Sequence, residues 1–240
     1  MKNLIISIVI LLSYTQLQAN CNKLVQSYEQ IAGCKNNKVI WSDGSSMIYD
    51  DGKKETFDKI LKNADIEDTF THSYTNGPYS NPSKNYDPGR YRNDKFFRKM
   101  YGNSAQAVKK NLATISWFGQ KVRVTRVNNV HKQLQKVAVD LAKEVKKNPK
   151  LKKYLTPMGG TFKWRKIAGT NRLSVHSFGA AVDINVKYSA YWRWSKGKYK
   201  YQNKIPTKIV KIFEKHGFIW GGKWYHYDTM HFEYRPEMLR

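Results

Sequence analysis

The stretch SVHSFGAAVDINV, residues Ser174 to Val186, joins a turn-like run to an apolar run that contains one aspartate, Asp183. A buried carboxylate is energetically costly unless it is paired or coordinates a metal. His176 precedes this aspartate by seven residues, and Gly179 between them lets the chain bend back towards it. The stretch therefore predicts a strand whose carboxylate has a partner, and His176 is the first candidate.

Residues 180–186 predict a strand because they form an apolar run directly after a glycine. Successive side chains of a strand point to opposite faces. One face then carries Ala181, Asp183 and Asn185, and the face towards the core carries Val182, Ile184 and Val186.

A second segment, residues 228–234 with the sequence DTMHFEY, is typical of a final strand. Within it, His231 and Glu233 share a face. Two strands can thus each present a metal-binding side chain from an apolar frame. Two imidazoles and one carboxylate, from His176, His231 and Asp183, match the composition of a catalytic zinc site that keeps one position open.

The rest of the chain predicts an α+β fold with a largely antiparallel sheet and flanking helices. Apolar residues recur at three- and four-residue steps from Val130 to Val145, which predicts a helix up to about Lys147. Further elements are expected as a hairpin within 39–51, a helix over 56–61, a long loop over 76–92, a strand or extended segment over 162–167, a strand over 121–127 and a helix over 207–216.

The charge of the chain is strongly positive, with 43 Lys and Arg against 18 Asp and Glu and a formal net charge of +25. Such a chain attracts polyanions. Nucleic acid, anionic envelope polymers and phospholipid surfaces are all candidates, because the basic residues are spread along the sequence rather than gathered in one run.

The N-terminus predicts an export signal over residues 1–19, with Lys2, the apolar run Leu4–Leu12 and a polar stretch ending at Ala19. The apolar run is too short to span a bilayer, so no transmembrane span is expected after cleavage. An uncleaved anchor and lipidation at Cys21 are the alternatives. We expect a periplasmic or extracellular protein, in which Cys21 and Cys34, the only cysteines, are candidates for a disulfide.

Two motifs resemble those of one family of zinc peptidases. SVHSFGAAVD, from Ser174 to Asp183, resembles the S-x-H-x-x-G-x-A-x-D signature of peptidase family M15, which includes D-Ala-D-Ala carboxypeptidases and L-alanyl-D-glutamate endopeptidases. DTMHFE, from Asp228 to Glu233, resembles the D-x-x-H-F-E element of the endopeptidase-like branch. The resemblance covers about 116–234. It implies a hedgehog/D-Ala-D-Ala peptidase-like zinc fold over 111–240, preceded by an N-terminal region of unknown role over 20–110.

The resemblance also implies roles for individual residues. His176, Asp183 and His231 would bind one Zn²⁺ per chain. Asp228 would be the general base that deprotonates the attacking water, whose pKa zinc lowers to about 7. Arg165 would stabilise the oxyanion of the tetrahedral intermediate, although Arg172 and Lys166 lie close to it in sequence.

Other polar residues have less specific roles. Ser174 is expected to hydrogen-bond a neighbour of the site, and His226 is a candidate for substrate contact. Glu233 is expected either to orient a ligand or to be a solvated strand residue. The remaining histidines lack ligand spacing and are read as structural: His72, His131 and His216.

The function expected is a zinc metallopeptidase that hydrolyses peptidoglycan stem peptides during cell-wall remodelling, as a D,D-carboxypeptidase or an L-Ala–D-Glu endopeptidase. Its basic surface would hold it near anionic envelope polymers. A non-catalytic, zinc-containing peptidoglycan-binding module is the first alternative. A secreted nucleic-acid binder or nuclease is the second, although two imidazoles and one carboxylate suit the Mg²⁺ of a nuclease poorly, and no specific nucleic acid is expected as a partner.

Overall fold

The computed structural model describes residues 18–76, 81–167 and 170–240. Most of the predicted export signal, residues 1–17, therefore lies outside the described residues. Within the described part of the chain, no helix is both long and apolar enough to cross a membrane. A helical stretch over 18–27 begins this part and contains Cys21, which is joined to Cys34 by a disulfide.

The N-terminal part contains a small antiparallel sheet in the order β1-β2-β3, formed by Ile31–Lys35, Lys38–Trp41 and Ser46–Ile48. The hairpin predicted within 39–51 is confirmed as β2 and β3, whereas β1 was not predicted. Helix α2, Phe57–Asn63, confirms the expected helix, and α3, Asp94–Tyr101, follows the long loop. The Asn93 side chain caps α3 by accepting a hydrogen bond from the backbone N–H of Phe96.

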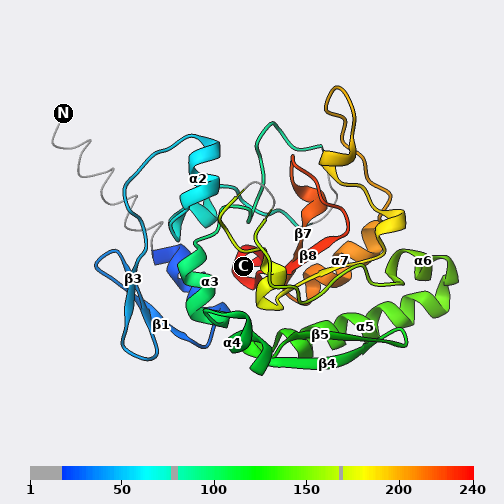
Figure 1. Ribbon diagram of the computed structural model, residues 1–240, viewed down its shortest axis with the longest axis horizontal. Coiled ribbons are helices and arrows are strands. Elements are labelled where there is room, and N and C mark those ends of the chain that lie inside the picture. Colours follow the sequence, from blue (N-terminus) through cyan, green and yellow to red (C-terminus); the bar gives the residue numbers. More distant parts are fainter. Residues whose placement is uncertain (1–17, 77–80, 168–169) are drawn as a thin grey trace.

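The middle of the chain forms a hairpin packed on a long helix. Strands β4, Leu112–Trp117, and β5, Gln120–Thr125, follow the short helix α4, Ala105–Lys110, and pair antiparallel. Phe118 and Gly119 both have positive φ, as a two-residue hairpin turn with the twist of its strands requires. Helix α5, Val130–Lys147, agrees with the apolar spacing, and the short α6, Lys152–Leu155, follows it along the lower edge of Figure 1.

The C-terminal half builds the sheet that carries the site. Its strands are β6, Ala181–Asp183; β7, Phe218–Trp220; and β8, His231–Tyr234. All pairings are antiparallel and the order is β6-β8-β7, so β8 is the central strand. Helix α7, Thr207–Lys215, leads into β7 through Gly217, which has a φ of 87°. Together with α5, these elements confirm the predicted α+β class.

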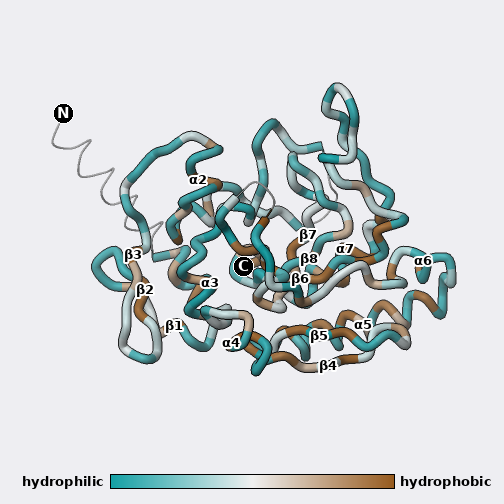
Figure 2. Tube along the Cα trace, viewed as in Figure 1, coloured by the Kyte–Doolittle hydropathy of each residue, from teal (hydrophilic) through white to brown (hydrophobic). Residues whose placement is uncertain are grey.

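One large buried hydrophobic cluster connects these parts. It contains residues of the N-terminal sheet, of α3, of the β4–β5 hairpin, of α5 and of the C-terminal sheet. Trp41 of β2 contacts Phe96 of α3, and Phe97 of the same helix contacts Phe178 next to the site. Figure 2 shows stretches of hydrophobic residues along β4, β5 and α5, which lie next to one another. The cluster includes residues from both 20–110 and 111–240, and the boundary between these ranges stays a prediction.

Several predicted strands are shorter in the structure. The strand over 180–186 ends at Asp183, because the chain turns into a 3-10 helix over Val186–Tyr188. The predicted alternation is therefore wrong beyond that point. Asn185 is buried and donates hydrogen bonds to the carbonyls of Lys153 and Thr156, whereas Val186 is 40% exposed.

Two other segments differ from the predicted strands in the same way. The final strand starts at His231 rather than at Asp228, which lies in the preceding loop. Residues 162–167, predicted as a strand or an extended segment, form no named strand and contain one isolated bridge, between Lys166 and Leu173. Both corrections leave the potential ligands at strand ends or in loops.

Candidate metal centre

Strand pairing brings two of the three potential ligands together. In the register of β6 and β8, Asp183 lies directly opposite His231. His176 lies in a 3-10 helix, Val175–Phe178, that ends at Gly179. Gly179 has a φ of 66°, and a Cβ at this position would lie 2.8 Å from the Leu112 side chain and 3.0 Å from the backbone nitrogen of Thr125. Only glycine suits this turn, which returns the chain to β6 beside the β4–β5 hairpin.

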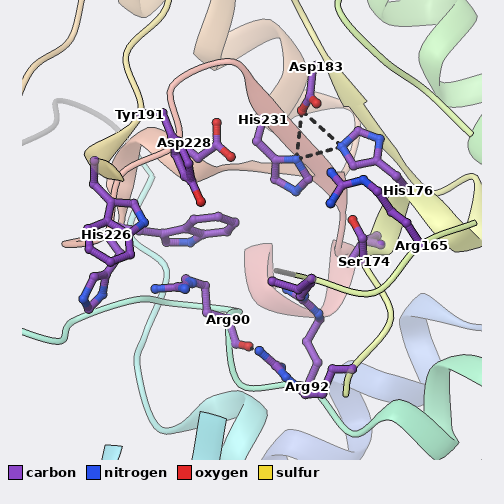
Figure 3. Close-up of a pocket in the computed structure, with 15 residues that line it drawn as sticks. Arg90, Arg92, Arg165, Ser174, His176, Asp183, Tyr191, His226, Asp228 and His231 are labelled. Carbon is purple, nitrogen blue, oxygen red and sulfur yellow. Dashed lines mark hydrogen bonds and ion pairs between the residues drawn. The ribbon is translucent and has the colours of Figure 1, made fainter. Parts of the chain in front are cut away.

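The three side chains converge on one point. The Nε2 atom of His176 lies 3.1 Å from Oδ1 of Asp183 and 3.2 Å from Nδ1 of His231. Nδ1 of His231 lies 3.0 Å from the same carboxylate oxygen. Figure 3 shows these atoms as a triangle at one side of the pocket. The sequence predicted these three residues as candidate ligands, and the structure places their donor atoms together.

Hydrogen bonds on the far side of each ring fix which nitrogen faces the triangle. Nδ1 of His176 lies 2.7 Å from the carbonyl oxygen of Thr161, so this nitrogen carries a proton and donates. Nε2 of His231 lies 3.1 Å from Oε2 of Glu233 and donates to that carboxylate. The nitrogens left for the triangle are Nε2 of His176 and Nδ1 of His231, both with a lone pair when the rings are neutral.

Three lone pairs at 3.0–3.2 Å from one another require a positive charge among them. A proton can supply it. Burial by itself lowers the pKa of His231, but hydrogen bonds to Asp183 and Glu233 outweigh burial and raise that pKa to about 10. A metal ion that displaces this proton can supply the charge instead. Two imidazole nitrogens and one carboxylate oxygen are a donor set that Zn²⁺ prefers, so the residues fit this ion.

Two other groups of described residues could hold a cation, and both consist only of carboxylates. They are Asp50, Asp51 and Asp65, and Asp65, Glu67 and Asp68. Neither contains an imidazole, and both lie in the N-terminal part of the chain. Among these three groups of described residues, the triangle of His176, Asp183 and His231 is the one whose donor atoms suit zinc.

Asp228 lines the same pocket as the triangle. One of its carboxylate oxygens, Oδ1, is buried and has no hydrogen-bond partner. Burial raises the pKa of this carboxyl to about 6. A carboxylate that lines the pocket and has a raised pKa is suited to accept a proton from a nearby water.

Gly221 allows the loop before β8 to hold Asp228 in place. The backbone N–H of Asp228 donates to the carbonyl oxygen of Gly221, and a Cβ on Gly221 would lie 2.7 Å from the carbonyl oxygen of Asp228. Gly221 thus lets its own segment and the segment of Asp228 approach closely beside the site.

The structure places the remaining candidates at different depths. Ser174 is buried and lines the pocket, and its backbone N–H donates to the carbonyl oxygen of Arg165. Arg165 is exposed and lines the pocket close to His176 in Figure 3. His226 also lines the pocket, with its Nδ1 at 2.6 Å from Oδ2 of Asp87. Lys166 is absent from the lining and contacts Asn171 instead.

Glu233 is fully buried, which excludes the solvated strand residue as its description. Its Oε2 contacts His231 and lies 3.3 Å from Nη1 of Arg92, and its Oε1 accepts a hydrogen bond from Nη1 of Arg235 at 3.0 Å. Burial by itself raises the pKa of Glu233, but these cationic neighbours hold it well below its usual range. Glu233 is therefore ionised and orients the His231 ring.

The N-terminal part contributes pocket residues that sequence reasoning missed. Arg90 and Arg92 line the pocket from the loop before α3. Asp87 is fully buried and accepts hydrogen bonds from His226 and Arg90. These residues belong to the segment 76–92, which was predicted only as a long loop, and no pattern placed that loop next to His226, more than a hundred residues later.

Replacing Glu233 by glutamine is expected to lower the affinity for Zn²⁺ by about 10- to 100-fold, because the amide loses the charge that holds the Nε2 proton of His231. Competition with a chromophoric chelator measures this affinity directly. Glu237→Gln is the matched control, because Glu237 is also buried and pairs with Arg235 but does not contact His231. Equal zinc affinities of the two variants would contradict an orienting role for Glu233.

Comparison with known families supports the resemblance found in the sequence. Residues 168–234 match the model of a peptidase M15 family that is described as D-alanyl-D-alanine carboxypeptidase. The matched range contains His176, Asp183, Asp228 and His231, and it supports a peptidase. No curated protein and no solved structure matches the chain.

Proposed function

We propose that this chain is a zinc-dependent peptidase that hydrolyses peptidoglycan stem peptides, in a hedgehog/D-Ala-D-Ala peptidase-like fold. The observation that carries the proposal is the convergence of the donor atoms of His176, Asp183 and His231 at 3.0–3.2 Å, with Asp228 lining the same pocket. A bound Zn²⁺ would act as a Lewis acid on the peptide carbonyl and lower the pKa of a water molecule.

The residues of the chain divide the remaining work. Asp228 accepts the proton of the attacking water and later returns it to the leaving amine. Arg165, close to His176, donates to the oxygen on which negative charge develops. His226 is held by Asp87 and is available to contact the substrate from the opposite side of the pocket.

Asp228 favours the endopeptidase-like branch, because it occupies the first position of the D-x-x-H-F-E element that is typical of that branch. Cleavage at L-Ala–D-Glu is accordingly the first expectation and cleavage at D-Ala–D-Ala the second. We further propose that the protein acts in the periplasm or outside the cell, where its formal charge of +25 holds it close to anionic envelope polymers.

The test is mass spectrometry of muropeptides after incubation of the purified protein with peptidoglycan. Products are expected with Zn²⁺, are lost on addition of a chelator and return when Zn²⁺ is restored. Stem peptides that begin at D-Glu identify the endopeptidase, and loss of a terminal alanine identifies the carboxypeptidase. Hydrolysis that is insensitive to the chelator refutes zinc dependence, and unchanged muropeptides under every condition favour the binding module.

A further inference from the structure

The pocket that contains the potential metal ligands is rich in arginine. Arg90, Arg92, Arg165 and Arg172 all line it. Two of them are neutralised by the protein itself, since Arg90 pairs with Asp87 and Arg92 with Glu233. Arg165 is exposed, so water solvates its charge. Arg172 is the member whose charge neither a carboxylate nor bulk water balances.

The environment of Arg172 is unusual for an arginine. Its side chain is only 7% exposed, and no carboxylate of the described residues lies within 4.0 Å of it. Among the described residues, its single side-chain hydrogen bond runs from Nη1 to the carbonyl oxygen of Arg90 at 3.2 Å, and its buried Nε has no partner there. Burial, with Arg92 and Arg90 close by, lowers its pKa to about 9. A buried, unpaired cation lowers the stability of the fold, and a bound ligand of opposite charge would remove this penalty.

We propose that Arg172, with Arg90 beside it, forms an anion subsite that binds a carboxylate of the substrate peptide. The guanidinium has the planar fork that matches a carboxylate, and Arg172 lines the pocket while its Nε–H has no hydrogen-bond partner among the described residues. Because Arg172 and the metal ligands line one pocket, the carboxylate belongs to a residue close to the bond that is cleaved.

This inference rests on the proposed peptidase function and narrows its substrate class to acidic peptides. A stem peptide offers two sources of the carboxylate, the C-terminal carboxylate and the free carboxylate of the D-Glu residue. Binding at the first favours removal of a terminal residue, and binding at the second favours cleavage next to D-Glu. The chemistry at Arg172 is the same in both cases.

Binding can be measured without turnover by titration calorimetry of the zinc-loaded Asp228→Ala variant. The probe is the pentapeptide L-Ala–D-Glu–L-Lys–D-Ala–D-Ala in three forms: unmodified, amidated at the C-terminus, and amidated at the free carboxylate of D-Glu. One of the amidated forms is expected to bind about 10- to 100-fold more weakly than the unmodified form, because a charge-assisted pair is lost. The form that loses affinity identifies the source.

When Arg172→Met is added to the Asp228→Ala variant, the affinity for the unmodified peptide is expected to fall by the same factor. The affinity for the amidated form that already binds weakly is expected not to change. Arg172→Lys should restore only part of the affinity, because lysine keeps the charge but not the fork. Arg123→Met is the matched control, since Arg123 is exposed on β5 outside the pocket and its loss lowers the net charge equally. Equal weakening by both Met variants would mean general charge attraction and overturn the subsite.

A thermal unfolding measurement separates binding from a purely structural role. Without peptide, Arg172→Met in the otherwise native chain is expected to keep or raise the unfolding midpoint, because an unpaired buried charge is removed. A clear fall in the midpoint, with equal binding of the three peptide forms, overturns the proposal. If the native protein hydrolyses all three forms at the same rate, the subsite is wrong and the peptidase stands. If no form is hydrolysed yet binding depends on Arg172, the peptidase function is wrong and the subsite stands.

Discussion

Replacing Asp228 by alanine is expected to reduce peptide hydrolysis by about 10²- to 10⁴-fold, the usual contribution of a general base. The variant should still bind one Zn²⁺ per chain, because Asp228 is not among the three converging donor residues. Its buried Oδ1 has no partner to lose, so the fold should tolerate the change. Rates of muropeptide release and metal content, measured on the same preparation, check the prediction.

His176→Ala is the comparison that gives this result its meaning. It removes one of the three converging donors, so activity and zinc content are expected to fall together. Asp228→Ala should lower activity alone. An Asp228→Ala variant that hydrolyses peptides at the native rate would remove this residue from the mechanism, and loss of zinc from it would make Asp228 part of the metal site.

Replacing Arg235 by methionine is expected to lower the free energy of unfolding by about 3–5 kcal/mol, the usual cost of removing one partner from a buried ion pair. Arg235 is fully buried, and it bonds Glu233 through Nη1 and Glu237 through Nε. Nη1 also donates to the carbonyl oxygen of Gly89 at 2.8 Å. Without Arg235, two buried carboxylates lose their shared counter-charge.

Chemical denaturation, fitted with a common slope, measures the difference. Arg98→Met is the control, because the Arg98–Asp94 pair on α3 is partly exposed and is expected to contribute at most about 1 kcal/mol. A change of similar size in both variants would show that burial of the pair at Arg235 carries no special cost.

The sequence predicted the elements of the C-terminal half better than their ends. Periodicity identified α5 and α7, since a long amphipathic pattern is a strong signal. It extended β6 to Val186, because an apolar run does not reveal where the chain leaves the sheet. Asn185 looked like an outward strand residue, yet its hydrogen bonds to the carbonyls of Lys153 and Thr156 are contacts between segments about thirty residues apart.

The sequence named the three residues whose donor atoms converge and some of the pocket residues around them. His176, Asp183 and His231 come from short segments that strand pairing joins, and their types and spacing indicate the chemistry. Asp228, Arg165 and His226 were also named and line the pocket. Arg90 and Arg92 line it because 87–92 packs against the C-terminal sheet, a contact that no local pattern encodes. The role of Glu233 also required its burial, since alternation along a strand gives its face but not its neighbours.

The buried charges behind His231 extend to the first described helical stretch. Arg235 donates hydrogen bonds to the carboxylates of Glu233 and Glu237, and Glu237 also accepts a hydrogen bond from the hydroxyl of Tyr28. A fragment that begins at residue 111 would retain both sequence motifs but leave Glu237 without Tyr28 and Glu233 without Arg92. The two motifs therefore do not contain everything that orients His231: residues before 111 supply Tyr28 and Arg92, which contact the carboxylates behind this candidate metal ligand.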